Sequence, residues 1–167
     1  MSTHIETFVR DFREAIKPCW GPDTGAYSAD LFPEGYEVPS SGGQCVVTSA
    51  VLLSELRHVF PGERFKLTVG AVYVGRVAAL GHHMYITRHP VLGRAPAVID
   101  ATADQAPAID DTVIFGDMQE LVTARGLTYL VFDQYDTLPD RICEDAPTPN
   151  NALERVAILQ ERLGAWR

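Results

Sequence analysis

The sequence predicts an α+β fold in which two helices precede a group of strands. Residues 4–17 place apolar side chains at helical spacing, and residues 44–59 form an apolar run long enough for a second helix. Residues 65–74 then alternate apolar side chains with their neighbours, as a half-buried strand does. Because the strands follow the helices instead of alternating with them, we expect one antiparallel sheet and not a series of βαβ units.

The first helix is supported by an apolar face and by signals at both ends. Thr3 and Glu6 have the spacing of a capping box, and Pro18 with the GPDTG segment at 21–25 ends the helical pattern. The apolar face consists of Ile5, Phe8, Val9, Phe12 and Ile16. Residues 26–43 contain two prolines and three glycines, so we expect a long loop, and long ordered loops often line functional sites.

The second helix is apolar around much of its circumference, which predicts a central position in the fold. Strand-like segments follow it at 65–74, 82–89 and 97–100, with a hairpin-like connection at 90–96. A short helix at 117–126 ends at Gly126, and residues 127–133 form another strand. A last helix, capped by Asn151 and Glu154, ends near Leu163.

Length, charge and cysteine content restrict the class of protein. The 167 residues fit a single domain spanning 1–167. The chain has 14 basic and 22 acidic residues and a net charge of −8, which argues against nucleic-acid and anionic membrane partners. No segment approaches the ~18 apolar residues of a membrane span. The chain has three cysteines, Cys19, Cys45 and Cys143. A small, odd number of cysteines does not indicate a disulfide framework, so we expect a reducing, cytoplasmic location.

Cys45 lies where a flexible turn meets the apolar helix, in the sequence GGQCVVTSAVLLSEL. One interpretation is that it packs as a small hydrophobic residue. The other is that the helix N-terminus lowers its pKa and makes it a nucleophile. Gly42 and Gly43 would let backbone N–H groups face a substrate oxygen.

A nucleophilic thiol needs a base, and five histidines are available. His4 and His58 are expected on solvated helix faces, which leaves His82, His83 and His89. Neighbouring strand residues point to opposite faces of a sheet, so His82 and His83 cannot both meet the thiol.

The third group of a catalytic triad would orient the imidazole. Asp100 ends the apolar segment AVID, where a buried carboxylate is costly unless it is paired, and an imidazole N–H is a suitable partner. Alternatively, Asp100 caps the turn ATADQ. Thiol, imidazole and carboxylate nevertheless occur in an order that suits nucleophile, base and orienting group.

Three segments resemble the YunG family, small bacterial proteins similar to papain-fold and transglutaminase-like thiol enzymes. They are AIKPCWGPDT at 15–24, GQC at 43–45 before the apolar helix, and IDATADQ at 99–105. The likeness covers the N-terminal two thirds, and LERVAILQERL at 153–163 is similar to the family's last helix. It implies a papain-like α+β fold, with the cysteine helix packed on an antiparallel sheet.

The resemblance also implies a Cys–His–Asp triad formed by Cys45, one histidine of the pair, and Asp100. The family pattern has an aromatic residue two positions after the histidine, which fits His83 followed by Tyr85. Strand alternation places these two side chains on one face. Ile86 stands where the family usually has asparagine.

Three further residues are candidates for substrate binding: Gln44, Tyr85 and Gln105. Gln44 would donate to an oxyanion or cap the helix, and Gln105 would line the cleft or hold its turn together. No cofactor is expected. No metal is expected either, because the histidines and carboxylates lack the spacing of a ligand set.

The function implied is that of a thiol-dependent hydrolase, a peptidase or deamidase, acting on an amide bond of a small molecule, peptide or protein. An acyltransferase with the same triad is an alternative. So is a non-catalytic binding module, since a fold does not determine a function.

Overall fold

The computed structural model describes residues 2–25, 41–90, 96–140 and 151–166. Within these ranges the fold is α+β, with four α-helices and one five-stranded antiparallel sheet, as predicted. Most of the expected loop at 26–43, the connection at 90–96 and Cys143 lie outside the described residues.

The helices and strands occur in the expected order. The helices are α1 (Ser2–Ile16), α2 (Cys45–Val59), α3 (Met118–Arg125) and α4 (Ala152–Leu163), with short 3-10 turns at Lys17–Cys19 and Ala103–Gln105. The strands are β1 (Arg64–Val74), β2 (Val77–His89), β3 (Ala97–Asp100), β4 (Ile114–Asp117) and β5 (Leu127–Tyr135). Their order across the sheet is β4-β3-β2-β1-β5, and every neighbouring pair is antiparallel.

Three details differ from the sequence-based expectation. Strand β2 begins at Val77 and not at residue 82, so β1 and β2 form a long hairpin whose turn contains Gly75 at φ 61°. Strand β4 was not expected at all. Two expected helix caps are wrong: Thr3 lies inside α1, with Glu6 paired to Arg10 at 2.8 Å, and the Asn151 side chain makes no cap on α4 but accepts from Arg155.

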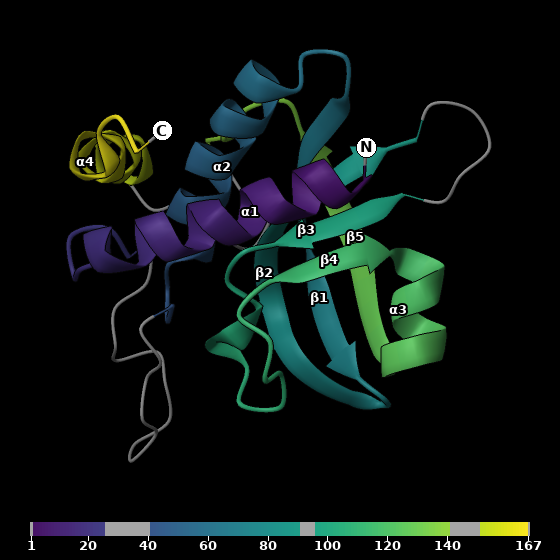
Figure 1. Cartoon of the computed structure of the whole chain (residues 1–167). Helices are drawn as coiled ribbons and strands as arrows, with labels where there is room; N and C mark the ends of the chain where they lie inside the picture. Colours follow the sequence, from purple (N-terminus) through teal and green to yellow (C-terminus); the bar gives the residue numbers. More distant parts are fainter. Residues whose placement is uncertain (1, 26–40, 91–95, 141–150, 167) are drawn as a thin grey trace.

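The sheet separates two apolar cores. Helices α1, α2 and α4 gather on one side of the sheet, whereas α3 lies apart from them beside β4 and β5 (Figure 1). Met84 and Ile86 of β2 belong to the core beneath α2, while Tyr85 belongs to the second core. Alternate residues of β2 therefore serve different cores, as the pleat requires.

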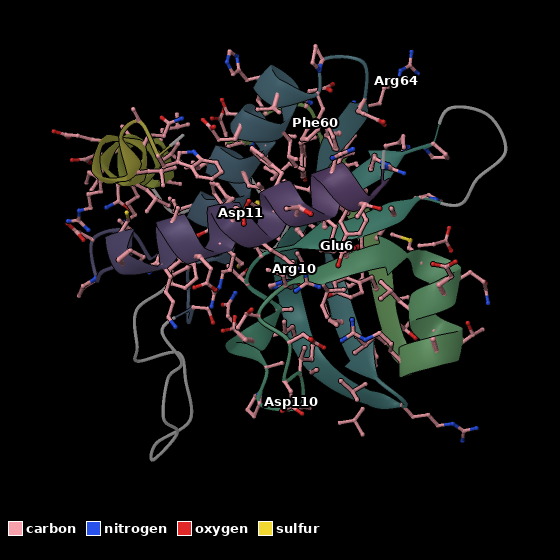
Figure 2. All side chains as sticks on the ribbon, viewed as in Figure 1. Glu6, Arg10, Asp11, Phe60, Arg64 and Asp110 are labelled. Atoms are coloured by element: carbon pink, nitrogen blue, oxygen red, sulfur yellow. The ribbon has the colours of Figure 1, made fainter. Side chains whose placement is uncertain are left out.

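Helix α1 is amphipathic, as expected. Its apolar residues Ile5, Val9 and Phe12 are fully buried, whereas Glu6 and Arg10 lie on its outer face (Figure 2). The helix is therefore held in place by burial of one face against the sheet side that carries α2.

Candidate active site

Cys45 is the first residue of α2 and is 3% exposed. The turn before it is closed by a hydrogen bond from Gln44 N–H to the Ser41 carbonyl, and Gly43 has a φ of 71°, a left-handed conformation that favours glycine. The sequence GGQC thus delivers the thiol to the helix end, where the first N–H groups have no partner within the helix.

The two neighbouring histidines point to opposite sides of β2. His83 is 1% exposed, and its imidazole is hydrogen-bonded to the Cys45 sulfur. His82 is exposed, with its ring 6.0 Å from that of Phe132. The expectation that only one of the pair can meet the thiol is confirmed, and that one is His83.

Asp100, the last residue of β3, is fully buried and saturated with hydrogen-bond donors. Its Oδ2 lies 2.7 Å from His83 Nε2 and accepts from the Tyr129 hydroxyl at 2.9 Å. Its Oδ1 accepts from the Thr102 N–H at 2.9 Å and from the Thr102 hydroxyl at 3.3 Å. Asp100 both orients the imidazole and caps the following turn, so the two alternatives for this residue occur together.

The three groups alter one another's ionisation. Burial alone would raise the pKa of Cys45, but His83, the Met84 backbone N–H and the Gln105 side chain together lower it. Burial would likewise lower the pKa of His83, yet Asp100 and Cys45 raise it to about 10.

Asp100 completes this arrangement of charges. Burial opposes its ionisation, but the charge of His83 and the surrounding donors lower its pKa. The His83 imidazolium therefore lies between the Asp100 carboxylate and the Cys45 thiol, and it favours the ionised form of both. Nε2 of the imidazole is bound to Asp100, which leaves Nδ1 for the thiol.

The two candidate glutamines have different roles. Gln105 Oε1 accepts from the Gly43 N–H at 3.0 Å, its Nε2 donates to the Thr102 carbonyl at 3.2 Å, and its side chain is also hydrogen-bonded to Cys45. Gln105 thus both holds its turn and lies at the thiol.

Gln44 is hydrogen-bonded to the GPDTG turn. Its amide donates to the Gly21 carbonyl and accepts from the Thr24 hydroxyl, and it forms no cap on α2. The assignment of this side chain to an oxyanion, or to a cap, is therefore replaced by a role in tying the GPDTG turn to α2.

The expected substrate contact of Tyr85 is also corrected. The ring lies 6.3 Å from that of His83, as the shared face predicted, but the residue is fully buried and its hydroxyl donates to the Leu130 carbonyl. Tyr85 therefore supports the imidazole from behind. Gly70 leaves room for the Leu130 carbonyl that accepts this hydrogen bond, since an added Cβ at residue 70 would lie 1.6 Å from the Leu130 oxygen.

Sequence reasoning missed Tyr129 and Thr102, which hold Asp100. Alternation in LTYLVFD would have placed Tyr129 on a buried face, and a buried hydroxyl needs a hydrogen-bond partner. Its ring packs edge-on against Tyr85 at 4.9 Å. Nothing in the sequence identified Asp100 as that partner, because β5 reaches it across the sheet.

Helix α1 supports the site from the other side. Arg13, 1% exposed, donates to the Ala101 carbonyl at 3.2 Å and pairs with Asp104 at 2.7 Å. Its guanidinium also lies over the Trp20 ring, whose indole N–H donates to the Thr48 hydroxyl on α2. Arg13 therefore joins the turn after Asp100 to the helix that bears Cys45.

The described part of the chain was searched for groups of metal ligands and for membrane-spanning helices. No three histidine, cysteine, aspartate or glutamate side chains there are grouped to hold an ion. No helix in these ranges is long and apolar enough to cross a bilayer.

The chain was compared with known proteins in three ways. None of the protein-family models matches it, and neither the curated proteins nor the solved structures contain a match.

Proposed function

We propose that the protein is a thiol-dependent hydrolase of papain-like architecture that cleaves an amide bond. The observation that carries this proposal is the buried chain of Cys45, His83 and Asp100, with the thiol at a helix N-terminus. Burying three ionisable groups is costly to stability unless they are paired, so such a cluster is a feature of functional sites.

In the proposed reaction, the Cys45 thiolate attacks the carbonyl carbon of the substrate. The negative charge that develops on the carbonyl oxygen is stabilised by the Cys45 N–H at the start of α2. The His83 imidazolium donates its proton to the leaving nitrogen as the carbon–nitrogen bond breaks, which leaves an acyl thioester on Cys45.

The second half of the reaction reverses the proton transfer. Neutral His83 takes a proton from water, the oxygen of that water attacks the thioester, and the acid product leaves as Cys45 returns to thiolate. Asp100 fixes the ring orientation throughout, because its Oδ2 stays bonded to Nε2.

Transfer of the acyl group to an amine is a second candidate function of the same site. The observation that favours it is the 3% exposure of Cys45, because a site that excludes water lets an amine compete as acceptor.

Cys19 and Cys45 are both free thiols, which supports a reducing compartment such as the cytoplasm.

A test of the proposal is to react the protein with an electrophilic probe for nucleophilic thiols, such as a peptide-like vinyl sulfone, which adds to a thiolate as a stable thioether, and to locate the adduct by mass spectrometry. We expect modification at Cys45 near neutral pH and none in Cys45→Ser. Cys19→Ser is a matched control, because burial raises the pKa of that thiol and the site does not use it. Labelling of Cys19 at the same rate as Cys45, or no labelling of Cys45, would refute the catalytic proposal.

A further inference from the structure

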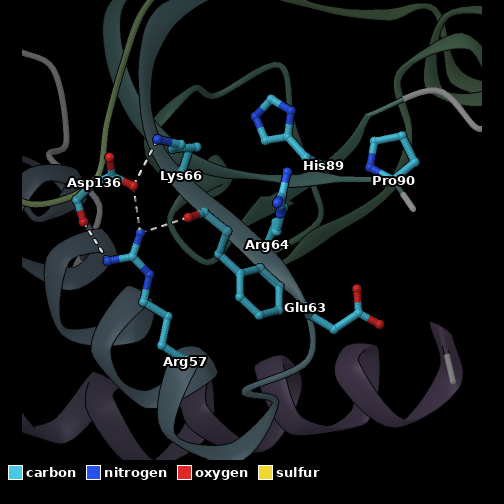
Figure 3. A pocket seen from close by; sticks show the side chains of 8 residues that line it. Arg57, Glu63, Arg64, Lys66, His89, Pro90 and Asp136 are labelled. Atoms are coloured by element: carbon cyan, nitrogen blue, oxygen red, sulfur yellow. Dashed lines mark hydrogen bonds and ion pairs between the residues drawn. The ribbon is translucent and has the colours of Figure 1, made fainter. Parts of the chain in front are cut away.

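A pocket lies at the far end of α2 from the thiol. It has a volume of about 680 Å³ and is formed where the last turn of α2 meets the beginning of β1 and the end of β2 (Figure 3). Arg57, on its wall, follows Cys45 by 57 − 45 = 12 residues, which is about 18 Å of helix. A small molecule held there would not contact the triad.

The charge of this pocket is opposite to that of the whole chain. Three cations outnumber two carboxylates in its lining, whose charged residues are Arg57, Glu63, Arg64, Lys66 and Asp136; His89, Phe65 and Pro90 complete it. The surplus is one positive charge (3 − 2) with the histidine neutral, whereas the chain carries −8. A local positive potential on an acidic protein attracts anions.

Part of this charge is already neutralised. Asp136 Oδ1 accepts from Lys66 Nζ at 2.7 Å and lies 3.4 Å from the Arg57 guanidinium. Arg57 also donates to the Phe65 carbonyl at 2.8 Å, so it is a structural link between α2 and the sheet. Lys66 retains two N–H groups beyond its bond to Asp136.

Two groups in the pocket have no partner among the described residues. Arg64 extends outward from the start of β1 at the pocket rim (Figure 2), and no ion pair or hydrogen bond joins its guanidinium to another described side chain. His89 Nε2 is a buried atom without a hydrogen-bond partner in the described chain. A buried nitrogen without a partner is costly, and a ligand oxygen would satisfy it.

The strand register brings these donors together. Arg64 of β1 pairs directly with His89 of β2, and Lys66 lies two residues further along the same face of β1. Opposite side chains in a sheet are about 5 Å apart at Cβ, and next-nearest ones on a face about 7 Å apart. In the view of Figure 3, Arg64 lies below His89 and to the right of Lys66.

We propose that this pocket binds the phosphate group of a small molecule, held by Arg64, Lys66 and His89. A planar guanidinium presents two parallel N–H groups to an oxyanion, and an ammonium and an imidazole approach from other directions. A tetrahedral dianion can accept from all three, whereas a carboxylate offers two oxygens in one plane and half the charge. The proposal does not depend on the triad.

Calorimetric titration with inorganic phosphate, and separately with acetate, tests this site. We expect one phosphate to bind per chain, and acetate to bind more weakly. Arg64→Gln should raise the Kd for phosphate about tenfold or more, since it removes a charge-assisted hydrogen bond. Arg76→Gln, an equal change of charge in the exposed β1–β2 turn, should leave the Kd unchanged.

His89→Leu provides a second variant and should also weaken phosphate binding. Absence of binding to the native protein would overturn the proposal. So would an equal loss in Arg64→Gln and Arg76→Gln, which would indicate a general effect of net charge. Acetate binding as tightly as phosphate would overturn the assignment to phosphate. None of these outcomes depends on the reactivity of Cys45, so this inference and the proposed hydrolase can fail separately.

Discussion

Replacing His83 by glutamine should raise the pKa of the Cys45 thiol above its ordinary value. Burial raises that pKa, and His83 is foremost among the groups that lower it. A glutamine amide can still donate a hydrogen bond to Asp100, so the buried carboxylate keeps a partner, but the amide carries no positive charge. The substitution therefore removes the charge at the centre of the triad while leaving a donor in its place.

The size of the effect follows from the ionisation of a thiol. With a pKa of about 10, His83 is an imidazolium at neutral pH. It loses its proton and its positive charge only when the pH rises through that value. Its positive charge favours the ionised form of Cys45, whose pKa is lowered. A thiol titrating at or above about 8.5 is at most about 3% ionised at pH 7, so His83→Gln should leave no more than about 3% of Cys45 as thiolate at that pH.

The thiolate population can be measured by its ultraviolet absorbance during a pH titration. The difference between the protein and Cys45→Ser removes the contribution of the other cysteines, and absorbance reports ionisation independently of reagent access to a residue that is 3% exposed. His82→Gln is the matched control and should titrate as the native protein does. An unchanged midpoint in His83→Gln, or an equal shift in His82→Gln, would refute the assignment of His83.

Three other substitutions test the support of the site. Asp100→Asn should raise the midpoint of the thiolate titration by less than His83→Gln, because the imidazole remains but loses the carboxylate that raises its pKa. Tyr129→Phe removes a 2.9 Å hydrogen bond to that carboxylate and should lower the free energy of unfolding by about 1.5–3 kcal/mol at pH 7, measured by urea denaturation. Gly70→Ala should cost more than about 2 kcal/mol, since its Cβ would lie 1.6 Å from a carbonyl oxygen of β5, whereas Gly62→Ala, with nothing within 4 Å, serves as the control.

The pH dependence of the Tyr129→Phe variant separates its role from simple packing. The pKa of Asp100 is lowered in the folded protein, so its contribution to stability is present above the unfolded value of about 3.9 and is lost as the pH falls through the folded value. The difference in unfolding free energy between the native protein and Tyr129→Phe should therefore become smaller in acid. A constant deficit at all pH values would contradict the hydrogen-bond argument.

The parts of the fold predicted from the sequence are those with strong local patterns. The apolar run after GGQC fixed α2 to within one residue, and alternation fixed β1 equally well. The beginning of β2 was missed because residues 77–81 are exposed or half-buried and contain a glycine, so they show no alternation. Strand β4 has four residues, too few for a periodic pattern.

The site shows a similar division. The alternation of neighbouring strand residues excluded that both histidines of the pair meet the thiol, and the family pattern of a histidine with an aromatic residue two positions later favoured His83. The roles of Gln44 and Tyr85 depended on where their hydrogen-bonding groups point in three dimensions, which the sequence does not specify. Tyr129 meets Asp100 across 29 residues of chain, a contact with no local signature.

The link from Arg13 has a consequence for the newly made chain. Arg13 and its partner Asp104 are 91 residues apart, and Cys45 precedes both His83 and Asp100. During synthesis the cysteine emerges first and remains an ordinary thiol, mostly protonated at neutral pH. The contacts of Cys45 with His83, and of His83 with Asp100, form only after the strands have paired, so until then the thiol keeps the reactivity of an ordinary cysteine.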